Sequence, residues 1–175
     1  MGQYYHPCII TQRGGITKVV AWLNAHKFGS GLKQMEHSFV GNSFVSAFEW
    51  LISPEGLHHK TQVVWAGDDY GLIEDGSEKS VYEMCEEKLH ANPQGNGDKY
   101  PYVVNHTLKL YIKKPKIVGK TYPIHLLPLL TRYTCMSSGG DYKGIHQNYL
   151  GKWACDVMSV EETPPEGFKN LPIRF

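Results

Sequence analysis

The stretch YVVNHTLKLYI, residues 102–112, has the clearest strand pattern in the chain. Successive side chains of a strand point to opposite faces, so every second residue shares a surface. One face would carry Tyr102, Val104, His106, Leu108, Leu110 and Ile112, and the other Asn105, Thr107, Lys109 and Tyr111. The alternation predicts one long strand with its more apolar face against a core.

Shorter strand patterns occur before and after this stretch. Residues 3–10 and 17–23 flank Gly14-Gly15 and predict an opening hairpin. Residues 61–66 form a short β-rich run, and residues 152–160 are apolar on both faces, as a central strand would be.

Helical periodicity appears in two segments. Residues 42–52 begin with a capping Asn or Ser, and residues 80–90 begin with a capping box made by Ser80 and Glu83. The side chains expected to be buried are Phe44, Ala47, Phe48, Leu51 and Ile52 in the first helix and Val81, Met84, Cys85 and Leu89 in the second. Residues 124–135 are apolar but interrupted by a proline, and they fit a helix or a strand.

Two helices and five or six strands without strict βαβ alternation predict the α+β class with a mainly antiparallel sheet. A chain of 175 residues can bury a core of its own. We expect one domain over residues 1–160 and an extended, proline-containing tail over residues 161–175 that packs on it.

The charge balance excludes some classes of function. Eighteen basic and seventeen acidic residues leave a formal net charge of +1, so no global field attracts nucleic acid or an anionic membrane. A lysine-rich stretch, residues 109–120, is read as the guarded edge of a sheet, with a local nucleic-acid patch as the alternative. No run approaches the roughly 18 apolar residues that span a bilayer, and a cytoplasmic protein is expected.

Cysteine and histidine patterns do not predict a metal site or a cofactor. Cys8, Cys85, Cys135 and Cys155 are widely spaced, with no C-x-x-C pair and no zinc-ligand spacing. They are interpreted as reduced, mostly buried thiols. The nine histidines include no H-x-H, H-x-x-x-H or H-E-x-x-H pattern.

A short phrase of glycine, aspartate and tyrosine occurs three times. The copies are Gly67-Asp68-Asp69-Tyr70, Gly97-Asp98-Lys99-Tyr100 and Gly140-Asp141-Tyr142. Carboxylates and aromatic rings on glycine turns at strand ends can bind a small polar ligand, although the same residues also simply form turns. The ligand-binding residues expected from the first and third copies are Trp65, Asp68, Asp69, Tyr70, Asp141 and Tyr142. The second copy is best interpreted as a turn.

An enzymatic alternative rests on His106 and Asp156. If their strands are neighbours, Asp156 could orient His106 as the acid–base pair of a hydrolase acting on a phosphoester or glycosidic bond. Both residues fall on apolar faces, where a structural role is the simpler interpretation. The chain has no Gly-x-Ser-x-Gly nucleophile motif.

Six phrases resemble small accessory proteins of bacteriophages and gut bacteria for which no activity is established. They are Met1-Gly2-Gln3-Tyr4-Tyr5, Glu36-His37-Ser38, Trp65-Ala66-Gly67-Asp68, Asn105-His106, Leu127-Pro128-Leu129-Leu130-Thr131 and Gly139-Gly140-Asp141-Tyr142. The resemblance implies no catalytic residue. It implies a phage-type binding protein that sequesters a nucleotide-like ligand of the bacterial host or blocks a host protein, as a counter-defence factor does.

Overall fold

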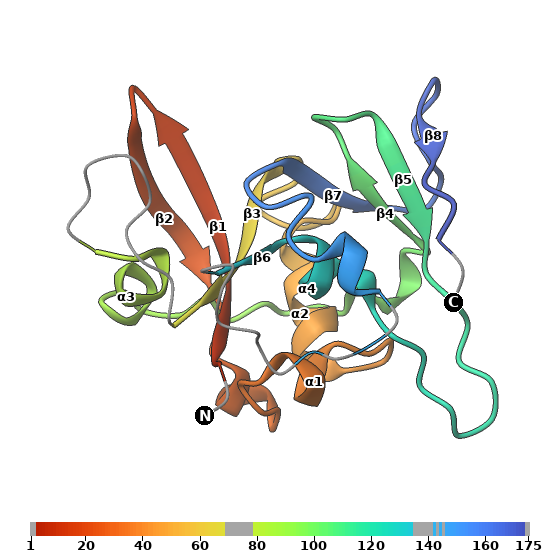
Figure 1. Ribbon diagram of the computed structural model, residues 1–175, viewed down its shortest axis with the longest axis horizontal. Helices are drawn as coiled ribbons and strands as arrows, with labels where there is room; N and C mark the ends of the chain where they lie inside the picture. The colour runs from red at the N-terminus through yellow and green to blue at the C-terminus, as the bar shows by residue number, and fades with distance from the viewer. Residues whose placement is uncertain (1–2, 69–78, 135–141, 143, 145, 174–175) are drawn as a thin grey trace.

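The computed structural model describes residues 3–68, 79–134, 142, 144 and 146–173 (Figure 1). The strands of this part are β1 Tyr5–Arg13, β2 Ile16–Trp22, β3 Thr61–Gly67, β4 Tyr102–Asn105, β5 Leu110–Lys113, β6 Arg132–Tyr133, β7 Val157–Glu161 and β8 Lys169–Asn170. Its α-helices are α1 Gln34–His37, α2 Ser43–Leu51, α3 Val81–Glu86 and α4 Leu126–Leu130, and its 3-10 helices are η1 Ala25–Phe28, η2 Gly97–Lys99 and η3 Gln147–Tyr149.

The α+β class is confirmed, but the expected sheet was wrong in size and type. The described strands form one mixed eight-stranded sheet in the order β2-β1-β3-β7-β4-β5-β8, with β6 paired to β3. The β3–β6 and β5–β8 pairs are parallel. Both parallel partners are only two residues long, which is too short to produce a periodic pattern in the sequence. Four short α-helices replace the two expected within the described residues.

Residues 102–112 are a hairpin instead of one long strand. β4 and β5 pair antiparallel, with Tyr102 opposite Lys113 and Asn105 opposite Leu110. The side-chain oxygen of Asn105 accepts the amide of Leu108 at 2.9 Å, and Lys109 adopts φ 55°. The turn therefore interrupts an alternation of polar and apolar residues that continues through it in the sequence.

The opening hairpin and the first helix are confirmed. β1 and β2 pair around Gly14 and Gly15, whose φ values of 58° and 76° suit a two-residue hairpin turn. Asn42 caps α2 by accepting the amides of Phe44 and Val45.

The second helix is confirmed at its start and wrong at its end. Ser80 and Glu83 form the expected capping box, but α3 stops at Glu86 and Leu89 is 97% exposed. Residues 124–135, whose pattern fits a helix or a strand, contain α4 followed by β6. Pro128 lies in the first turn of α4, where the missing backbone N–H costs no helical hydrogen bond.

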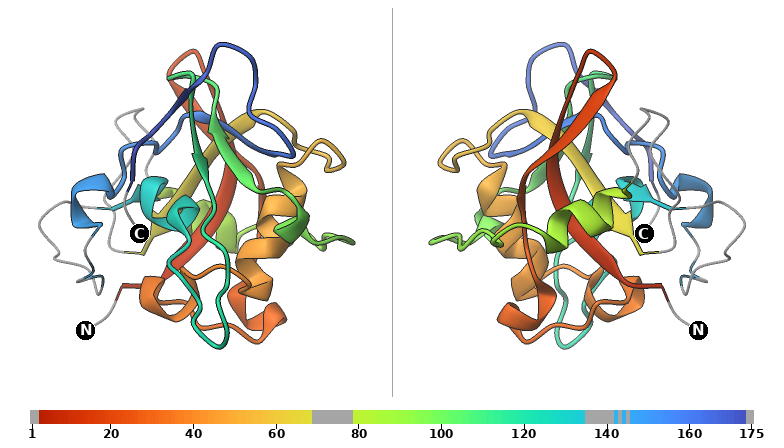
Figure 2. Two further views of the ribbon diagram at one scale, coloured as in Figure 1. Left: turned by 90° about the vertical axis from the view of Figure 1, so that its right-hand side faces the viewer. Right: turned by 90° about the vertical axis from the view of Figure 1, so that its left-hand side faces the viewer.

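Strands β1 and β3 are covered on both faces (Figures 1 and 2). Alternate residues enter two separate cores: Ile9 and Trp65 pack in the larger core with α2 and α4, whereas Cys8 and Val64 pack in a smaller core with α3. Figure 2 shows α3 against β1 and β2 on one side of the molecule and the β4–β5 hairpin on the other.

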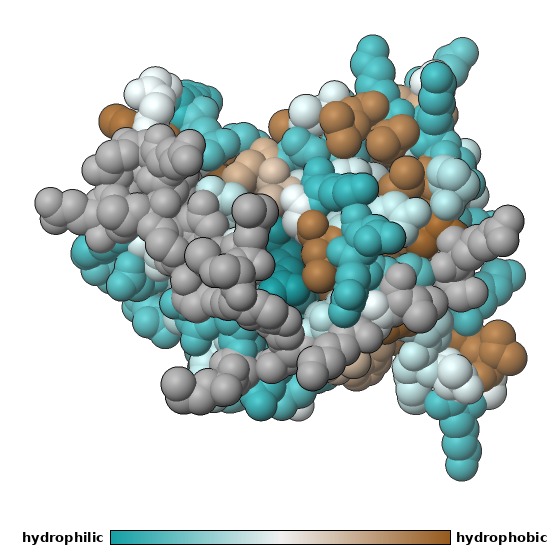
Figure 3. Space-filling view, viewed as in Figure 1, coloured by the Kyte–Doolittle hydropathy of each residue, from teal (hydrophilic) through white to brown (hydrophobic). Residues whose placement is uncertain are grey.

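The C-terminal segment contributes to the sheet through β8, which pairs with β5. Leu171 and Ile173 pack against the larger core. In Figure 3, apolar residues gather at the upper right of the molecule, the region where Figure 1 shows β5 and β8. The expected division into a domain over residues 1–160 and a tail over residues 161–175 stays a prediction.

The lysine-rich stretch does not form one exposed patch. Lys113 lies over the ring of Tyr102, whereas Lys114 is only 9% exposed and forms a buried ion pair. Among the described helices, none is long and apolar enough to cross a membrane.

Candidate functional site

Trp65 lies within β3 and belongs to the core. Its side chain is fully buried, and its indole N–H donates to Nε2 of His37 at 2.8 Å. The rings of Phe44 and Phe48 meet it edge-on, with centroids 6.0 and 5.2 Å away. Trp65 therefore holds β3 against α2, and its ring has no face open to a ligand.

Asp68 follows β3 directly and is exposed. Its Oδ1 accepts the amide of Tyr4 at 3.1 Å, and its own amide donates to the Tyr4 carbonyl at 3.0 Å. These two bonds extend the pairing of β1 and β3 beyond the strand ends. Asp69, Tyr70 and Asp141 lie outside the described residues, so a meeting of the first and third phrases stays a prediction.

Tyr142 lies in the walls of two cavities. The larger has a volume of about 610 Å³, and its described lining is Arg132, Tyr133, Thr134, Tyr142, Gln147, Leu150, Gly151 and Ala154. The smaller has a volume of about 310 Å³ and is lined by Met35, Ser38, Phe39, Tyr122, Ile124 and Tyr142. A tyrosine from the third phrase thus lies where two hollows share a wall, and both volumes are in the range of small-molecule sites.

Two buried polar atoms on these walls have no hydrogen-bond partner within the described part of the chain. They are Nε of Arg132 and Oγ of Ser38, which belong to residues 8% and 4% exposed. The hydroxyl of Tyr142, a residue 2% exposed, accepts the backbone amide of His146, and its own proton has no acceptor among the described residues. An unsatisfied buried polar group costs roughly 1–3 kcal/mol. A ligand with acceptor oxygens would satisfy the donors at Arg132 and Tyr142.

The positive charge at the larger cavity is held in place by two contacts. Nη2 of Arg132 donates to Oε1 of Gln3 at 3.1 Å, and the guanidinium lies 5.6 Å from the ring centroid of Tyr5. Burial raises the pKa of Tyr142 above its ordinary value, which keeps its hydroxyl protonated at neutral pH. The cavity therefore offers a fixed cation and a neutral O–H donor.

The side chains of His106 and Asp156 hydrogen-bond to other residues and not to each other. Oδ2 of Asp156 accepts Nδ2 of Asn105 at 2.7 Å. Nε2 of His106 lies 2.8 Å from Oγ of Ser159. Their strands β4 and β7 are neighbours, as the hydrolase hypothesis requires, but the hairpin turn places His106 beyond the end of β4.

A chain of polar contacts connects His106 to a carboxylate. Oγ of Ser159 donates to Oε1 of Glu161 at 2.6 Å, and Nε2 of His59 lies 2.6 Å from the same oxygen. Since Ser159 donates to Glu161, His106 must donate to Ser159. Ser159 is fully buried, so it is not placed as a nucleophile.

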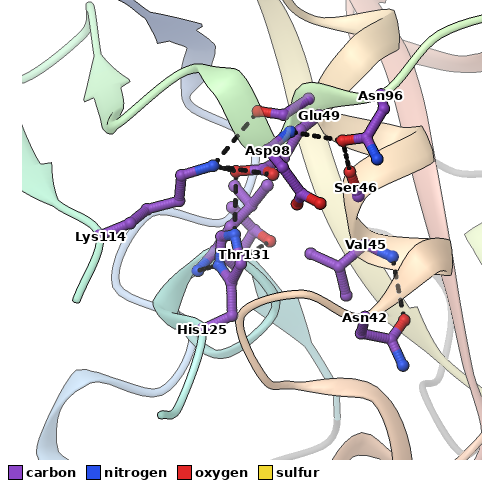
Figure 4. A network of polar contacts seen from close by, with 11 residues as sticks. Asn42, Val45, Ser46, Glu49, Asn96, Asp98, Lys114, His125 and Thr131 are labelled. Carbon is purple, nitrogen blue, oxygen red and sulfur yellow. Dashed lines mark hydrogen bonds and ion pairs between the residues drawn. The ribbon is translucent and has the colours of Figure 1, made fainter. Parts of the chain in front are cut away.

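A buried polar network surrounds Glu49 (Figure 4). No motif in the sequence predicts it. Nε2 of His125 and Nζ of Lys114 both lie 2.9 Å from Oε1 of Glu49. Nδ1 of His125 accepts the amide of Leu127, so its Nε2 carries the proton donated to Glu49. The network ties α2, the segment after β5 and the start of α4 together, and its side chains are at most 6% exposed.

The second Gly-Asp-Tyr phrase is part of this structural region. Gly97–Lys99 form η2, and Asn96 caps it by accepting the amide of Asp98. The carbonyl of Gly97 also accepts a hydrogen bond from Lys114 at 3.3 Å. Tyr100 is 1% exposed and packs in the larger core, so this copy has a packing role.

No group of three or more His, Cys, Asp or Glu side chains in the described residues is arranged to hold a metal ion. No protein-family model matches the chain, no curated protein matches it, and no solved structure matches it. Any function must therefore be argued from the geometry of its sites.

Proposed function

We propose that this protein binds a small polar ligand of the nucleotide class in the two cavities that share Tyr142. One observation carries the proposal: Arg132 and Tyr142 line a cavity of about 610 Å³, and each has a buried donor without an acceptor among the described residues. Phosphate oxygens are the acceptors that best fit an arginine beside a hydroxyl. Tyr133 and Tyr142 add aromatic surface for a base or a ribose.

The resemblance to phage accessory proteins supplies the context of the proposal. In that context the protein acts in the cytoplasm of a bacterial host and lowers the free concentration of a host signalling nucleotide. Sequestration requires only binding, so this form of the proposal needs no turnover.

The test is a thermal-shift and calorimetric screen against cyclic dinucleotides, ADP-ribose derivatives and mononucleotides, with inorganic phosphate for comparison. A ligand at 100 times its Kd adds about 2.7 kcal/mol, which raises Tm by roughly 5–10 °C for a chain of this size. If none of these compounds raises Tm, the small-ligand proposal fails and binding to a host protein becomes the better hypothesis.

Tyr142→Phe removes the hydroxyl and keeps the ring in the core. We expect it to weaken binding about tenfold, the effect of one lost hydrogen bond of about 1.4 kcal/mol. Tyr111→Phe is the matched control, since Tyr111 lies on β5 and lines neither cavity. Equal affinity of both variants would place the ligand elsewhere.

The second candidate is a hydrolase that uses His106. It is supported by the contact chain from His106 through Ser159 to Glu161, which makes Glu161 the carboxylate linked to His106. The candidate predicts that His106→Ala abolishes hydrolysis of a phosphoester or glycoside without unfolding the domain. Equal activity of the variant and the parent protein would remove it.

A further inference from the structure

Two cysteines 77 positions apart meet between the sheet and α3. Sγ of Cys8, on β1, lies 2.6 Å from Sγ of Cys85, on α3. Both side chains are fully buried, and both are free thiols. Neither belongs to the cavities of the proposed ligand site.

Regular structure fixes both cysteines. Cys8 pairs with Trp22 on one side and Val64 on the other, so its place in the sheet is set by two ladders. Cys85 lies in the last turn of α3, whose first turn is closed by the Ser80/Glu83 capping box. Both cysteines belong to the smaller core, together with Val81 from the first turn of α3.

The separation of the sulfurs is close to that of a covalent bond. A disulfide has an S–S length of about 2.05 Å, so the two atoms need to approach by only about half an ångström. We propose that Cys8 and Cys85 are a redox modification site that forms an intramolecular disulfide with a low-molecular-weight disulfide, such as oxidised glutathione, as the oxidant.

The reaction is two successive thiol–disulfide exchanges. The thiolate of Cys85 attacks one sulfur of the small disulfide; a mixed disulfide forms and the first small thiolate leaves. The thiolate of Cys8 then attacks Sγ of Cys85, forms the Cys8–Cys85 bond and releases the second small thiolate. Two electrons pass from the cysteine pair to the oxidant, and the two thiol protons are taken up by the released small thiolates.

The burial of both sulfurs sets the rate of this exchange. Burial raises the pKa of Cys8 well above its ordinary value, so the folded protein holds little of its thiolate at neutral pH. The six-residue α3 must leave the sheet transiently to admit the oxidant, and this movement carries Cys85 away from the sheet. The disulfide prevents later separation of α3 from β1, so oxidation converts a reversible contact into a permanent one.

The test uses a protein in which Cys135→Ser and Cys155→Ser leave only the pair. It is incubated with oxidised glutathione, denatured, alkylated and weighed. We expect a product 2 Da lighter than the dithiol with no alkylation, and a rise in Tm of about 5–10 °C that dithiothreitol reverses. A product that retains two alkylatable thiols, or a stable double glutathione adduct, would overturn the proposal.

A matched control keeps one thiol of the pair. Cys85→Ala in the same background removes the partner and should show no reversible rise in Tm on oxidation. A rise in the control as large as in the pair would mean that the shift does not come from a Cys8–Cys85 bond. If the serine substitutions prevent folding, peptide mapping of the oxidised parent protein decides: a linked peptide containing Cys8 and Cys85 supports the proposal, and any other pairing refutes it.

Discussion

Lys114 donates two hydrogen bonds to the buried carboxylate of Glu49, with Nζ 2.9 Å from Oε1 and 3.0 Å from Oε2. Their side chains are 6% and 1% exposed. Removing one partner of a buried ion pair leaves an uncompensated charge and typically costs 3–5 kcal/mol. We therefore expect Lys114→Met to lower the free energy of unfolding by about 3 kcal/mol, measured by urea denaturation.

The double variant Glu49→Gln/Lys114→Met separates pairing from packing. Because it removes both charges, its loss of unfolding free energy should be smaller than the sum of the losses measured for Glu49→Gln and Lys114→Met alone. Lys99→Met, which breaks an exposed ion pair with Glu55, is the control and should cost far less. Additive losses in the double variant would show that Glu49 and Lys114 are not energetically coupled.

The contact of Trp65 with His37 predicts a loss of stability in acid. Nδ1 of His37 donates to the Gly31 carbonyl, so Nε2 must stay unprotonated to accept from Trp65. Burial lowers the pKa of His37 to about 4. The unfolded state then binds more protons between about pH 4 and 6.5, so the free energy of unfolding falls as pH drops through this window, by up to about 3 kcal/mol.

His37→Gln tests this assignment, because an amide can accept from Trp65 and donate to Gly31 without titrating. Urea denaturation at pH 7 and pH 4.5 should show a smaller fall in stability for the variant than for the parent protein. Some fall should remain, since burial also lowers the pKa of His6 to about 4. The same fall in both proteins would show that His37 is not a source of the acid sensitivity.

Local signals predicted the parts of the fold that local interactions build. The capping groups of α2 and α3 and the glycine pair between β1 and β2 act within a few residues, so they can be read from the sequence. The long-range parts gave no such signal. β6 and β8 are two residues long and depend on pairing with distant strands, and Asn105 ends β4 through a side-chain contact that leaves the polar alternation unchanged.

The same limit applies to the candidate site. Tyr142 was predicted as a ligand-binding residue and does line two cavities, whereas Trp65 lies in the core because β3 is covered on both faces. Arg132 belongs to no motif, and Ser38 occurs only in a phrase of the resemblance that implies no site for it. Only the fold places these two residues in the walls that they share with Tyr142. Likewise, no pattern in the sequence predicts that Cys8 and Cys85, which are 77 positions apart, lie next to each other.

Gly97 packs directly on α2 and should not tolerate a side chain. A Cβ at this position would lie 2.3 Å from Cβ of Glu49 and 2.9 Å from the carbonyl of Ser46. We expect Gly97→Ala to cost about 2–3 kcal/mol of unfolding free energy through overpacking. Gly167→Ala is the control: its φ is 79° but its Cβ has open space, so only backbone strain of about 1 kcal/mol applies. A larger loss at position 167 than at position 97 would contradict this packing.

Asn105 is the residue that ends β4, and Asn105→Asp tests how it does so. The aspartate keeps an oxygen for the Leu108 amide but replaces the amide that donates to Asp156 with a second carboxylate. At pH 7 the two charges repel, and we expect the unfolding free energy to be about 2–3 kcal/mol lower than that of the parent protein at the same pH.

This loss should depend on pH. Repulsion raises the pKa of one of the two carboxyl groups in the folded variant, so the folded state binds a proton before the unfolded state does, and the loss shrinks as pH falls toward 4.5. Asn105→Ala removes the donor to Asp156 but adds no second carboxylate, so its loss should change less with pH than that of Asn105→Asp. Urea denaturation of the three proteins at both pH values gives the comparison, and a constant deficit for Asn105→Asp would mean that its carboxylate turns away from Asp156.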